Sequence, residues 1–252
     1  IRGTKAGTPV KFTQTGSDYG VARLIYEDSK AGAYRAFGVL STAVLHESGD
    51  ALVTGLDGHY LTSDGKIQLD AQVMTSDIDG QSRGYGGFID GEFAIKKGVV
   101  QRVGIEYFDR DLDINDLGFL ERNDSFRIRS SHIRTSSGLG WAKSNQFDLR
   151  GYVQENNDGL FTGAAVFLSD SLTLNNLSNV LLRVGFFPKA FDDLNSFGNG
   201  TYRTALRRDV AIRFSSPNTN KWSFGSGIGW REEMLGGRHI SVGGGLTWRP
   251  ND

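Results

Sequence analysis

Five acidic residues at short intervals could bind a hard cation. They are Asp109, Asp111, Asp113, Asp116 and Glu121. Alternating carboxylates open the calcium loop of an EF-hand, because Ca²⁺ prefers several oxygen ligands. That loop needs Gly at its sixth position and Glu at its twelfth, where this chain has Ile114 and Leu120. The sequence therefore favours solvated carboxylates at a strand end, and we expect neither a metal nor a cofactor.

A serine and histidine pair is the second candidate chemistry. A neutral imidazole can take the proton of a serine hydroxyl, which would support lipid hydrolysis in a membrane barrel. In a strand, Ser131 and His132 point to opposite faces, whereas Ser130 shares the His132 face with Phe126 and Ile128. No Gly-x-Ser-x-Gly segment marks a nucleophile. We therefore predict no catalysis, and a membrane hydrolase stays open as an alternative.

Arginines form the third conspicuous group. Its members are Arg127, Arg129, Arg203, Arg207, Arg208 and Arg213. Arg127 and Arg129 share a strand face, so they would either attract anions in a lumen or pair with acids of other strands, such as Asp90, Glu92 and Asp148. With 28 basic and 29 acidic residues in the chain, ion pairing is the favoured interpretation. A glycosidase would need two catalytic carboxylates, and among 29 acidic residues some pair would fit by chance, so the sequence assigns no such pair.

Two segments near the end of the chain show which elements hold these residues. In residues 221–231 and 238–248, apolar and small or charged residues alternate with a period of two, which only an extended strand separates into two faces. Trp222 and Trp230 lie on one face, and eight residues place them about 26 Å apart along a strand. Trp248 ends the second segment on its apolar face. On a strand that is tilted in the membrane, this distance roughly matches the height of the apolar band between the aromatic girdles of an outer-membrane barrel.

The same alternation continues in residues 66–75, 83–96, 99–110 and 146–154. Tyr85 and Tyr107 fall on the apolar faces, so we assign them with the three tryptophans to a lipid-facing girdle. Charged residues fall on the opposite faces and would line a wet lumen. The predicted lumen residues are Asp90, Glu92, Arg102, Glu106, Asp148 and Arg150.

Composition agrees with one large all-β domain over residues 1–252. The chain has 34 Gly, 4 Pro and no Cys, and no apolar run approaches the roughly 18 residues of a membrane helix. A net charge of −1 argues against a nucleic-acid partner. The first residues lack the basic start and apolar core of a signal peptide, so we expect a removed signal or an internal fragment.

The pattern predicts about thirteen strands, starting near residues 19, 33, 51, 65, 82, 99, 124, 143, 158, 176, 200, 220 and 236. Many are longer than the usual five or six residues of soluble strands. The predicted fold is an antiparallel up-and-down transmembrane β-barrel. Single-chain bacterial barrels close with an even number of strands, so we expect this chain to be part of a larger barrel.

Three stretches carry a family resemblance. They are DINDLGFLERND (residues 113–124), DYGVARLIYE (residues 18–27), and a tail with Pro188, Asp192, Asp193, Trp222 and LTWRP. With them the chain resembles, over nearly its whole length, a family of bacterial outer-membrane β-barrel domains of unknown function. Asn115, Gly118, Phe119 and Arg122 look like that family's loop motif, although Asp116 stands where the family has Pro.

The resemblance implies a place and an architecture. In that family the barrel commonly follows a domain that resembles family 9 carbohydrate-binding modules, so such a domain, the first strand and the closing strands would lie outside this sequence. We expect a barrel of the bacterial outer membrane that anchors, or forms a conduit for, carbohydrate recognition, with membrane lipid, carbohydrate or a plug protein as partners. The alternative is a soluble or surface all-β protein that binds or hydrolyses glycans.

Overall fold

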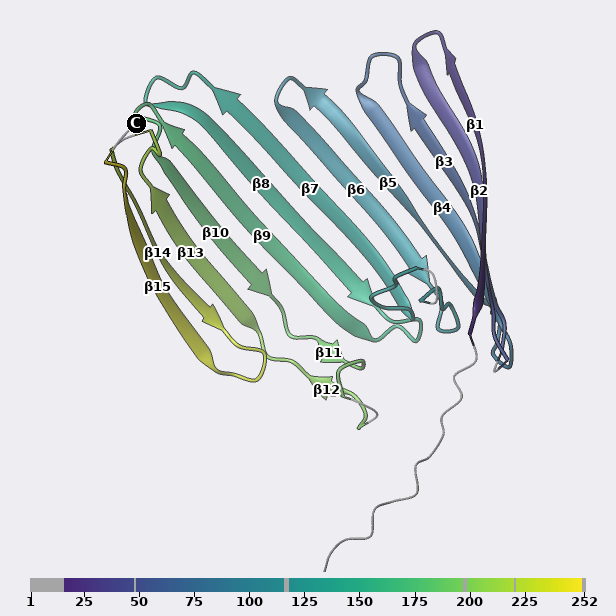
Figure 1. Ribbon diagram of the computed structural model, residues 1–252. Helices are drawn as coiled ribbons and strands as arrows, with labels where there is room; N and C mark the ends of the chain where they lie inside the picture. Colours follow the sequence, from purple (N-terminus) through teal and green to yellow (C-terminus); the bar gives the residue numbers. More distant parts are fainter. Residues whose placement is uncertain (1–15, 48, 116–117, 197–198, 220, 251–252) are drawn as a thin grey trace, which may run out of the picture.

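The structure is a computed structural model that describes residues 16–47, 49–115, 118–196, 199–219 and 221–250. Every regular element in these ranges is a β-strand (Figure 1). The strands are β1 Asp18–Lys30, β2 Ala33–Leu45, β3 Ala51–Leu61, β4 Ile67–Ile78, β5 Gly84–Lys96, β6 Val99–Phe108, β7 Ser125–Ser137, β8 Ala142–Glu155, β9 Phe161–Leu174, β10 Asn179–Phe187, β11 Phe191–Asp192, β12 Tyr202–Arg203, β13 Arg207–Ser215, β14 Trp222–Glu232 and β15 Arg238–Trp248. The described ranges contain no helix long and apolar enough to span a bilayer.

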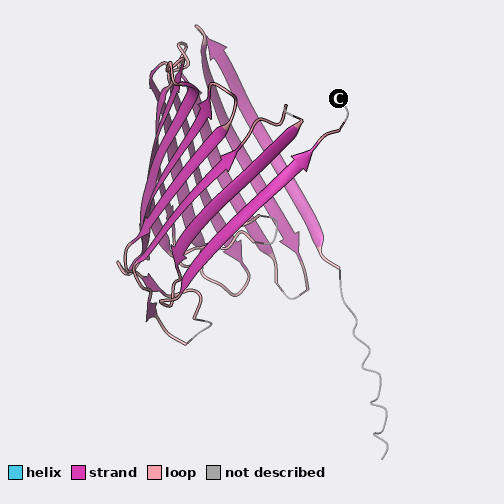
Figure 2. Cartoon of the chain, turned by 90° about the vertical axis from the view of Figure 1, so that its left-hand side faces the viewer, coloured by secondary structure: helices cyan, strands magenta, loops and turns pink. Residues whose placement is uncertain are grey.

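Thirteen strands form one antiparallel sheet in which each strand pairs with its neighbours along the chain. The order runs from β1 to β10 and then through β13, β14 and β15, while β11 and β12 form a separate two-stranded sheet. The all-β, up-and-down prediction and the count of thirteen strands are confirmed. The sheet curves strongly but does not close, because β1 and β15 each pair on one side only (Figure 2).

One strand differs from the prediction. A strand was expected near residue 200, but the sheet strand β13 begins at Arg207. The preceding residues form β12, whose Tyr202 pairs with Asp192 of β11 and donates a hydrogen bond of 2.9 Å from its hydroxyl to the Asp192 carboxylate. The acidic side chain therefore retains this segment in a local hairpin outside the sheet.

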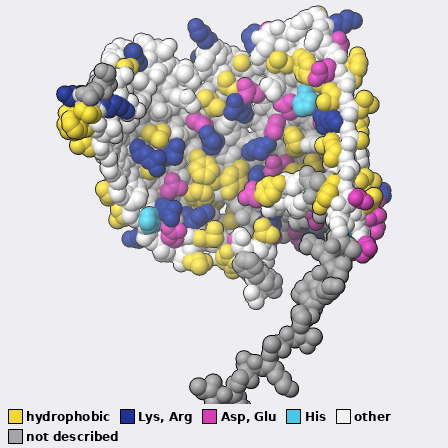
Figure 3. All heavy atoms as spheres, in the orientation of Figure 1, with side chains coloured by type: hydrophobic (Ala, Val, Ile, Leu, Met, Phe, Trp, Pro, Cys, Tyr) yellow, Lys and Arg dark blue, Asp and Glu magenta, His cyan; other side chains and the backbone are white. Residues whose placement is uncertain are grey.

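Side-chain alternation gives the curved sheet two different faces. On the convex face lie apolar residues that are largely exposed, such as Val166, Ile212 and Val242, at 50%, 45% and 78%. The concave face carries Arg, Lys, Asp and Glu side chains, which gather in the hollow of the sheet (Figure 3). Among the described residues, the buried hydrophobic set consists mainly of Ala, and its largest fully buried member is Leu112. The sheet thus has no conventional apolar core.

The two ends of the sheet have different connections. At one end, β1–β2 and β5–β6 are joined by two residues each, Ala31–Gly32 and Lys97–Gly98, with Gly32 at φ 80° and Gly98 at φ 76°. Such tight turns need left-handed residues, which explains the Gly. At the other end lie the two longest connections, residues 109–124 and 188–206. The loops of this second end carry the family motif.

We expect Gly98→Ala to destabilise the fold more than Gly138→Ala. Both glycines have positive φ, so each substitution carries the left-handed penalty of about 1–2 kcal/mol. A Cβ at Gly98 would also lie 2.3 Å from the carbonyl oxygen of Thr135, whereas nothing lies within 4 Å at Gly138. Urea unfolding of both variants measures the difference, and equal midpoints would contradict the clash.

Candidate functional site

The six predicted lumen residues all lie on the concave face. The strand registers pair Glu92 with Arg102 and place Glu106 and Asp90 in the same alternation, and Asp148 and Arg150 continue it on β8. The Arg102 Nε donates to Glu92 at 2.6 Å. Arg150 is hydrogen-bonded to Asp148 of its own strand. The structure therefore brings these residues to one face, although they come from three strands, β5, β6 and β8.

Arg127 and Arg129 are held by acids of other strands. The Arg129 guanidinium donates to both carboxylate oxygens of Asp90, at 2.8 and 2.7 Å, and lies 3.4 Å from Glu106. Arg127 lies 3.2 Å from Glu106 and donates to Gln154 at 2.7 Å. The sequence left two roles open for these arginines, attraction of anions and ion pairing, and the structure shows ion pairing. An anion filter would require arginines without such partners.

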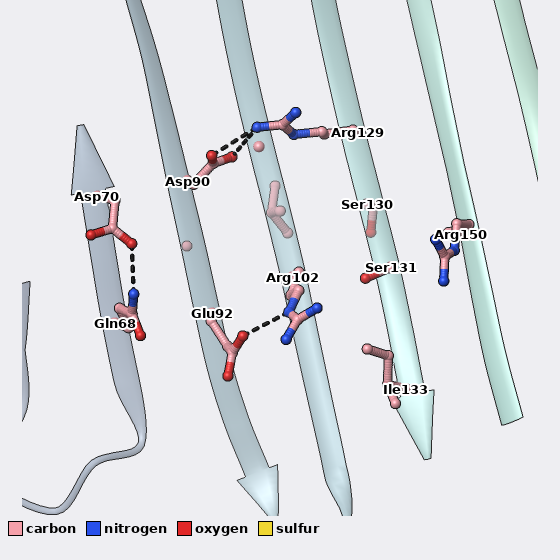
Figure 4. A pocket seen from close by; sticks show the side chains of 13 residues that line it. Gln68, Asp70, Asp90, Glu92, Arg102, Arg129, Ser130, Ser131, Ile133 and Arg150 are labelled. Carbon is pink, nitrogen blue, oxygen red and sulfur yellow. Dashed lines mark hydrogen bonds and ion pairs between the residues drawn. The ribbon is translucent and has the colours of Figure 1, made fainter. Parts of the chain in front are cut away.

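These pairs border a groove of about 400 Å³ on the concave face (Figure 4). Its wall runs from Gln68 and Asp70 on β4 to Arg150 on β8. Figure 4 shows the Asp90–Arg129 and Glu92–Arg102 pairs next to each other, the first joining β5 to β7 and the second joining β5 to β6. The groove thus presents guanidinium donors and carboxylate acceptors next to each other.

A second network of charged side chains lies on the concave face near β1. Arg23 is 2.8 Å from Asp57, and His59 contacts Asp57 at 3.2 Å and Asp70 at 2.7 Å. These contacts cross from β1 to β4. Because Asp70 also borders the groove, charged contacts extend over the concave face from β1 to β8.

The five predicted girdle residues lie on the convex face near strand ends. Trp222 and Trp248 are register partners at the end with the short turns, and their rings stack with centroids 5.5 Å apart. Tyr85, Tyr107 and Trp230 lie near the end with the long loops. The aromatic residues therefore form two groups separated by the length of the strands.

The side chains of Ser130 and His132 both contact Gln101. Both lie on the convex face, and the Gln101 side chain stands between them: it donates to the Ser130 hydroxyl at 2.8 Å and contacts His132 Nδ1 at 3.2 Å. Ser131 points to the concave face, where its register partners are Arg102 and Arg150. The serine hydroxyl thus has the amide of Gln101, and not the imidazole, as its partner.

Two of the acidic residues after β6 accept hydrogen bonds from backbone N–H groups, one in β5 and one in their own loop. Asp109 accepts from the backbone N–H of Tyr85 at 2.7 Å, and Asp113 accepts from Asn115. Asp116 lies outside the described residues. Within the described ranges, no three Asp, Glu or His side chains converge as metal ligands would.

The family-motif loop folds back onto the concave face. Leu112 is fully buried beside Gly84 and Gly86, where an added Cβ would lie 2.3 Å from the Leu112 backbone and 2.6 Å from its side chain, respectively. The backbone N–H of Asp113 also donates to the buried Ser76 hydroxyl at 3.1 Å. The two glycines thus make room for the loop at this end of the sheet.

Arg122 joins this loop to two others. Its guanidinium donates to Asp193 at 2.8 Å, and both side chains are nearly buried, at 12% and 15% exposure. Asn156, between β8 and β9, donates to the same carboxylate at 3.0 Å. We call Arg122, Asn156 and Asp193 the loop clamp. Asn115 and Gly118 act within the loop: Asn115 accepts from the Leu120 N–H at 2.9 Å, and a Cβ at Gly118 would lie 2.8 Å from the Ile114 carbonyl.

The sequence missed part of this arrangement. Phe119, a motif residue, is 83% exposed and contributes nothing to the clamp, whereas Leu112, Asn156 and Ser76 were not singled out. Asp193 was noted only for its place in the tail. The presence of Arg122 and Asp193 in separate resemblance stretches was the one signal of their contact.

Ionisation matters for the clamp. Partial burial raises the pKa of the Asp193 carboxyl. Hydrogen bonds from Arg122 and Asn156, together with the charge of Arg122, lower the pKa by a larger amount, so that it lies below the ordinary 3.8. Burial likewise raises the pKa of Asp192, and bonds from Asn195, Tyr202 and Leu194 outweigh it, so the pKa is lowered. Both carboxylates are therefore ionised near neutral pH.

We expect Arg122→Ala and Asp193→Ala to be strongly non-additive. Each single change leaves a nearly buried charge without its partner, whereas the double change removes both. A coupling free energy of about 2 kcal/mol is expected from a hydrogen-bonded charge pair. Urea unfolding of the three variants measures it. The exposed pair Arg83–Asp77 is the matched control and should show little coupling; additive effects at the clamp would contradict its role.

Acid should loosen the clamp. Because the folded pKa of Asp193 is lowered, its stabilising contribution is complete above the ordinary value of 3.8 and is lost as the pH falls through the folded value. A dye on Glu121→Cys, in a chain without native Cys, reports loop mobility by fluorescence anisotropy. In the Asp193→Asn background the anisotropy should be low already at neutral pH, and an identical acid transition in both proteins would contradict the assignment.

Comparison with known proteins gives a family but no activity. No curated protein matches the chain. A family model described as a domain of unknown function (DUF5916) matches residues 38–235. That range runs from β2 into the β14–β15 connection, and it contains the groove, the motif loop and the loop clamp. The chain therefore belongs to the DUF5916 family of domains of unknown function.

Proposed function

We propose that this chain forms part of the wall of a bacterial outer-membrane β-barrel that acts as an anchor or conduit and has no catalysis of its own. The observation that carries the proposal is the apolar convex face. Its aliphatic side chains are left largely exposed by the described residues, and exposing so much contiguous apolar surface to water would be costly. Lipid chains would cover that surface without this cost.

Strand length supports the same proposal. The sheet strands run from nine residues in β10 to fourteen in β8 and β9. A tilted transmembrane strand needs about 9–11 residues, whereas soluble strands usually have five or six. The two aromatic groups, Trp222 and Trp248 at one end and Tyr85, Tyr107 and Trp230 at the other, would then lie at the two membrane interfaces.

The free edges of β1 and β15 require further strands. Backbone N–H and C=O groups at an open edge find no partner in hydrocarbon, so only a closed barrel spans a bilayer. We infer that additional strands complete the wall. In bacterial barrels the short turns face the periplasm and the long loops face outward, which would place the loop clamp on the outer side.

The link to carbohydrate recognition rests on the resemblance, which implies a preceding carbohydrate-binding domain. In this proposal the barrel holds that domain at the membrane, and its lumen is a path for carbohydrate or a seat for a plug protein. The soluble alternative, a glycan-binding protein or hydrolase, would leave the convex face in water. The polar and apolar faces therefore favour the membrane proposal.

Neighbouring residues of β13 provide a sharp test. Ala211 lies on the concave face and Ile212 on the convex face, and the chain has no Cys. In membranes that carry the protein, Ala211→Cys should react with a hydrophilic maleimide, whereas Ile212→Cys should be protected from it. Equal reaction at both positions, or extraction of a monodisperse protein without detergent, would overturn the proposal.

A further inference from the structure

Three of the aromatic rings on the concave face lie on β8, β9 and β10, among the charged residues. Tyr152 of β8 is the register partner of Ala165 on β9, and Phe167 stands two residues further along β9 on the same face. Phe187 ends β10, two residues from Gly185, the partner of Phe167. A hydrophobic patch over β8 and β9 is visible between the charged side chains in Figure 3. Alternation alone predicts polar residues here, so the rings need a separate explanation.

Contacts fix the orientation of these rings. Phe187 meets Phe167 edge to face, with centroids 5.2 Å apart and an interplanar angle of 84°. The Arg207 guanidinium lies 4.4 Å from the Phe187 centroid and covers that ring. Phe187 therefore supports Phe167 and offers little free surface of its own.

Small residues let the remaining two rings lie along the wall. A Cβ at Gly163 would lie 3.6 Å from the Tyr152 ring, and Ala165, the register partner of Tyr152 on β9, is only 1% exposed. Larger side chains at these positions would lift the rings from the sheet. Tyr152 and Phe167 both border a small cavity of about 180 Å³, where the Arg127 guanidinium lies 5.7 Å from the centroid of the Tyr152 ring. We call these two rings the aromatic platform.

The platform adjoins the charged groove. Arg129 and Arg150 border both the small cavity and the groove of about 400 Å³. Further along the groove, Ser131 supplies a hydroxyl and Asp90 a carboxylate. A ligand on the rings would therefore meet donors and acceptors along one side.

This combination selects a chemical class. A sugar ring has C–H faces that pack on an aromatic ring, and its hydroxyls both donate and accept, so they suit a wall of alternating guanidinium and carboxylate groups. A simple anion or cation would meet both signs of charge, already paired with each other. A purely apolar ligand would displace water from these ion pairs and offer them no hydrogen bonds in return.

We propose that Tyr152 and Phe167 form a binding platform for a neutral oligosaccharide in the lumen, with Arg129, Arg150, Ser131 and Asp90 hydrogen-bonding its hydroxyls. The proposal rests on the function as a conduit and names its ligand class. Phe187 and Arg207 are positioning residues that hold the platform.

Protection of a single cysteine tests the site. Ser169 lies on the concave face two residues from Phe167, and Ser169→Cys in the membrane-embedded chain would be labelled with a hydrophilic maleimide. Maltohexaose, cellohexaose and xylohexaose are the probes, and sulfate and citrate are the anionic comparison. We expect at least one hexasaccharide to slow labelling and the two anions to have no effect.

Ring removal separates binding from structure. Tyr152→Ala and Phe167→Ala should each raise the half-protecting sugar concentration about tenfold, the size expected for loss of one aromatic stacking contact. Phe186→Ala, the convex-face neighbour of Phe187, is the matched control and should leave it unchanged. Circular dichroism of each variant checks that the strands persist.

The outcomes divide cleanly. If none of the three hexasaccharides protects, if the anions protect equally, or if protection survives removal of both rings, the sugar platform is wrong. Those results leave the conduit proposal in place provided that Ala211→Cys and Ile212→Cys still label differently. Equal labelling at that pair would instead remove the membrane barrel itself.

Discussion

A continuous ladder of backbone hydrogen bonds determines the rest of this structure. Thirteen strands pair antiparallel with their chain neighbours, so the pleat of each strand is carried into the next through the register. Because side chains alternate along a strand, the ladder assigns every residue to one of two faces. Charged residues from different strands thus meet on the concave face, and apolar ones cover the convex face.

The two faces stabilise the sheet by different means. On the concave side, several carboxylates and guanidiniums are paired across strands, as between Asp90 and Arg129. On the convex side the aliphatic residues have no covering layer among the described residues. Among the described residues the sheet therefore lacks the usual apolar core, and its convex face and the outer edges of β1 and β15 are left uncovered.

The loops of one end obey a different constraint, because no ladder holds them. Leu112 anchors the motif loop against Gly84 and Gly86, and Arg122 joins it to Asp193, 71 residues away. These contacts hold the two long loops at the end of the sheet that also carries the aromatic platform. The family motif therefore marks a tie between loops, which is a structural role that residue types alone did not reveal.

The sequence by itself determined the strands and their faces, since a period of two is a local property of each strand. It therefore placed Asp90, Glu106 and Arg150 on one face and Trp222 and Trp248 on the other. Only the tertiary structure decided register, open edges and loop contacts, because these join residues far apart in the chain, and a shift of one residue reverses every side chain. For the same reason the β11–β12 hairpin, the loop clamp and the aromatic platform were not visible in the pattern.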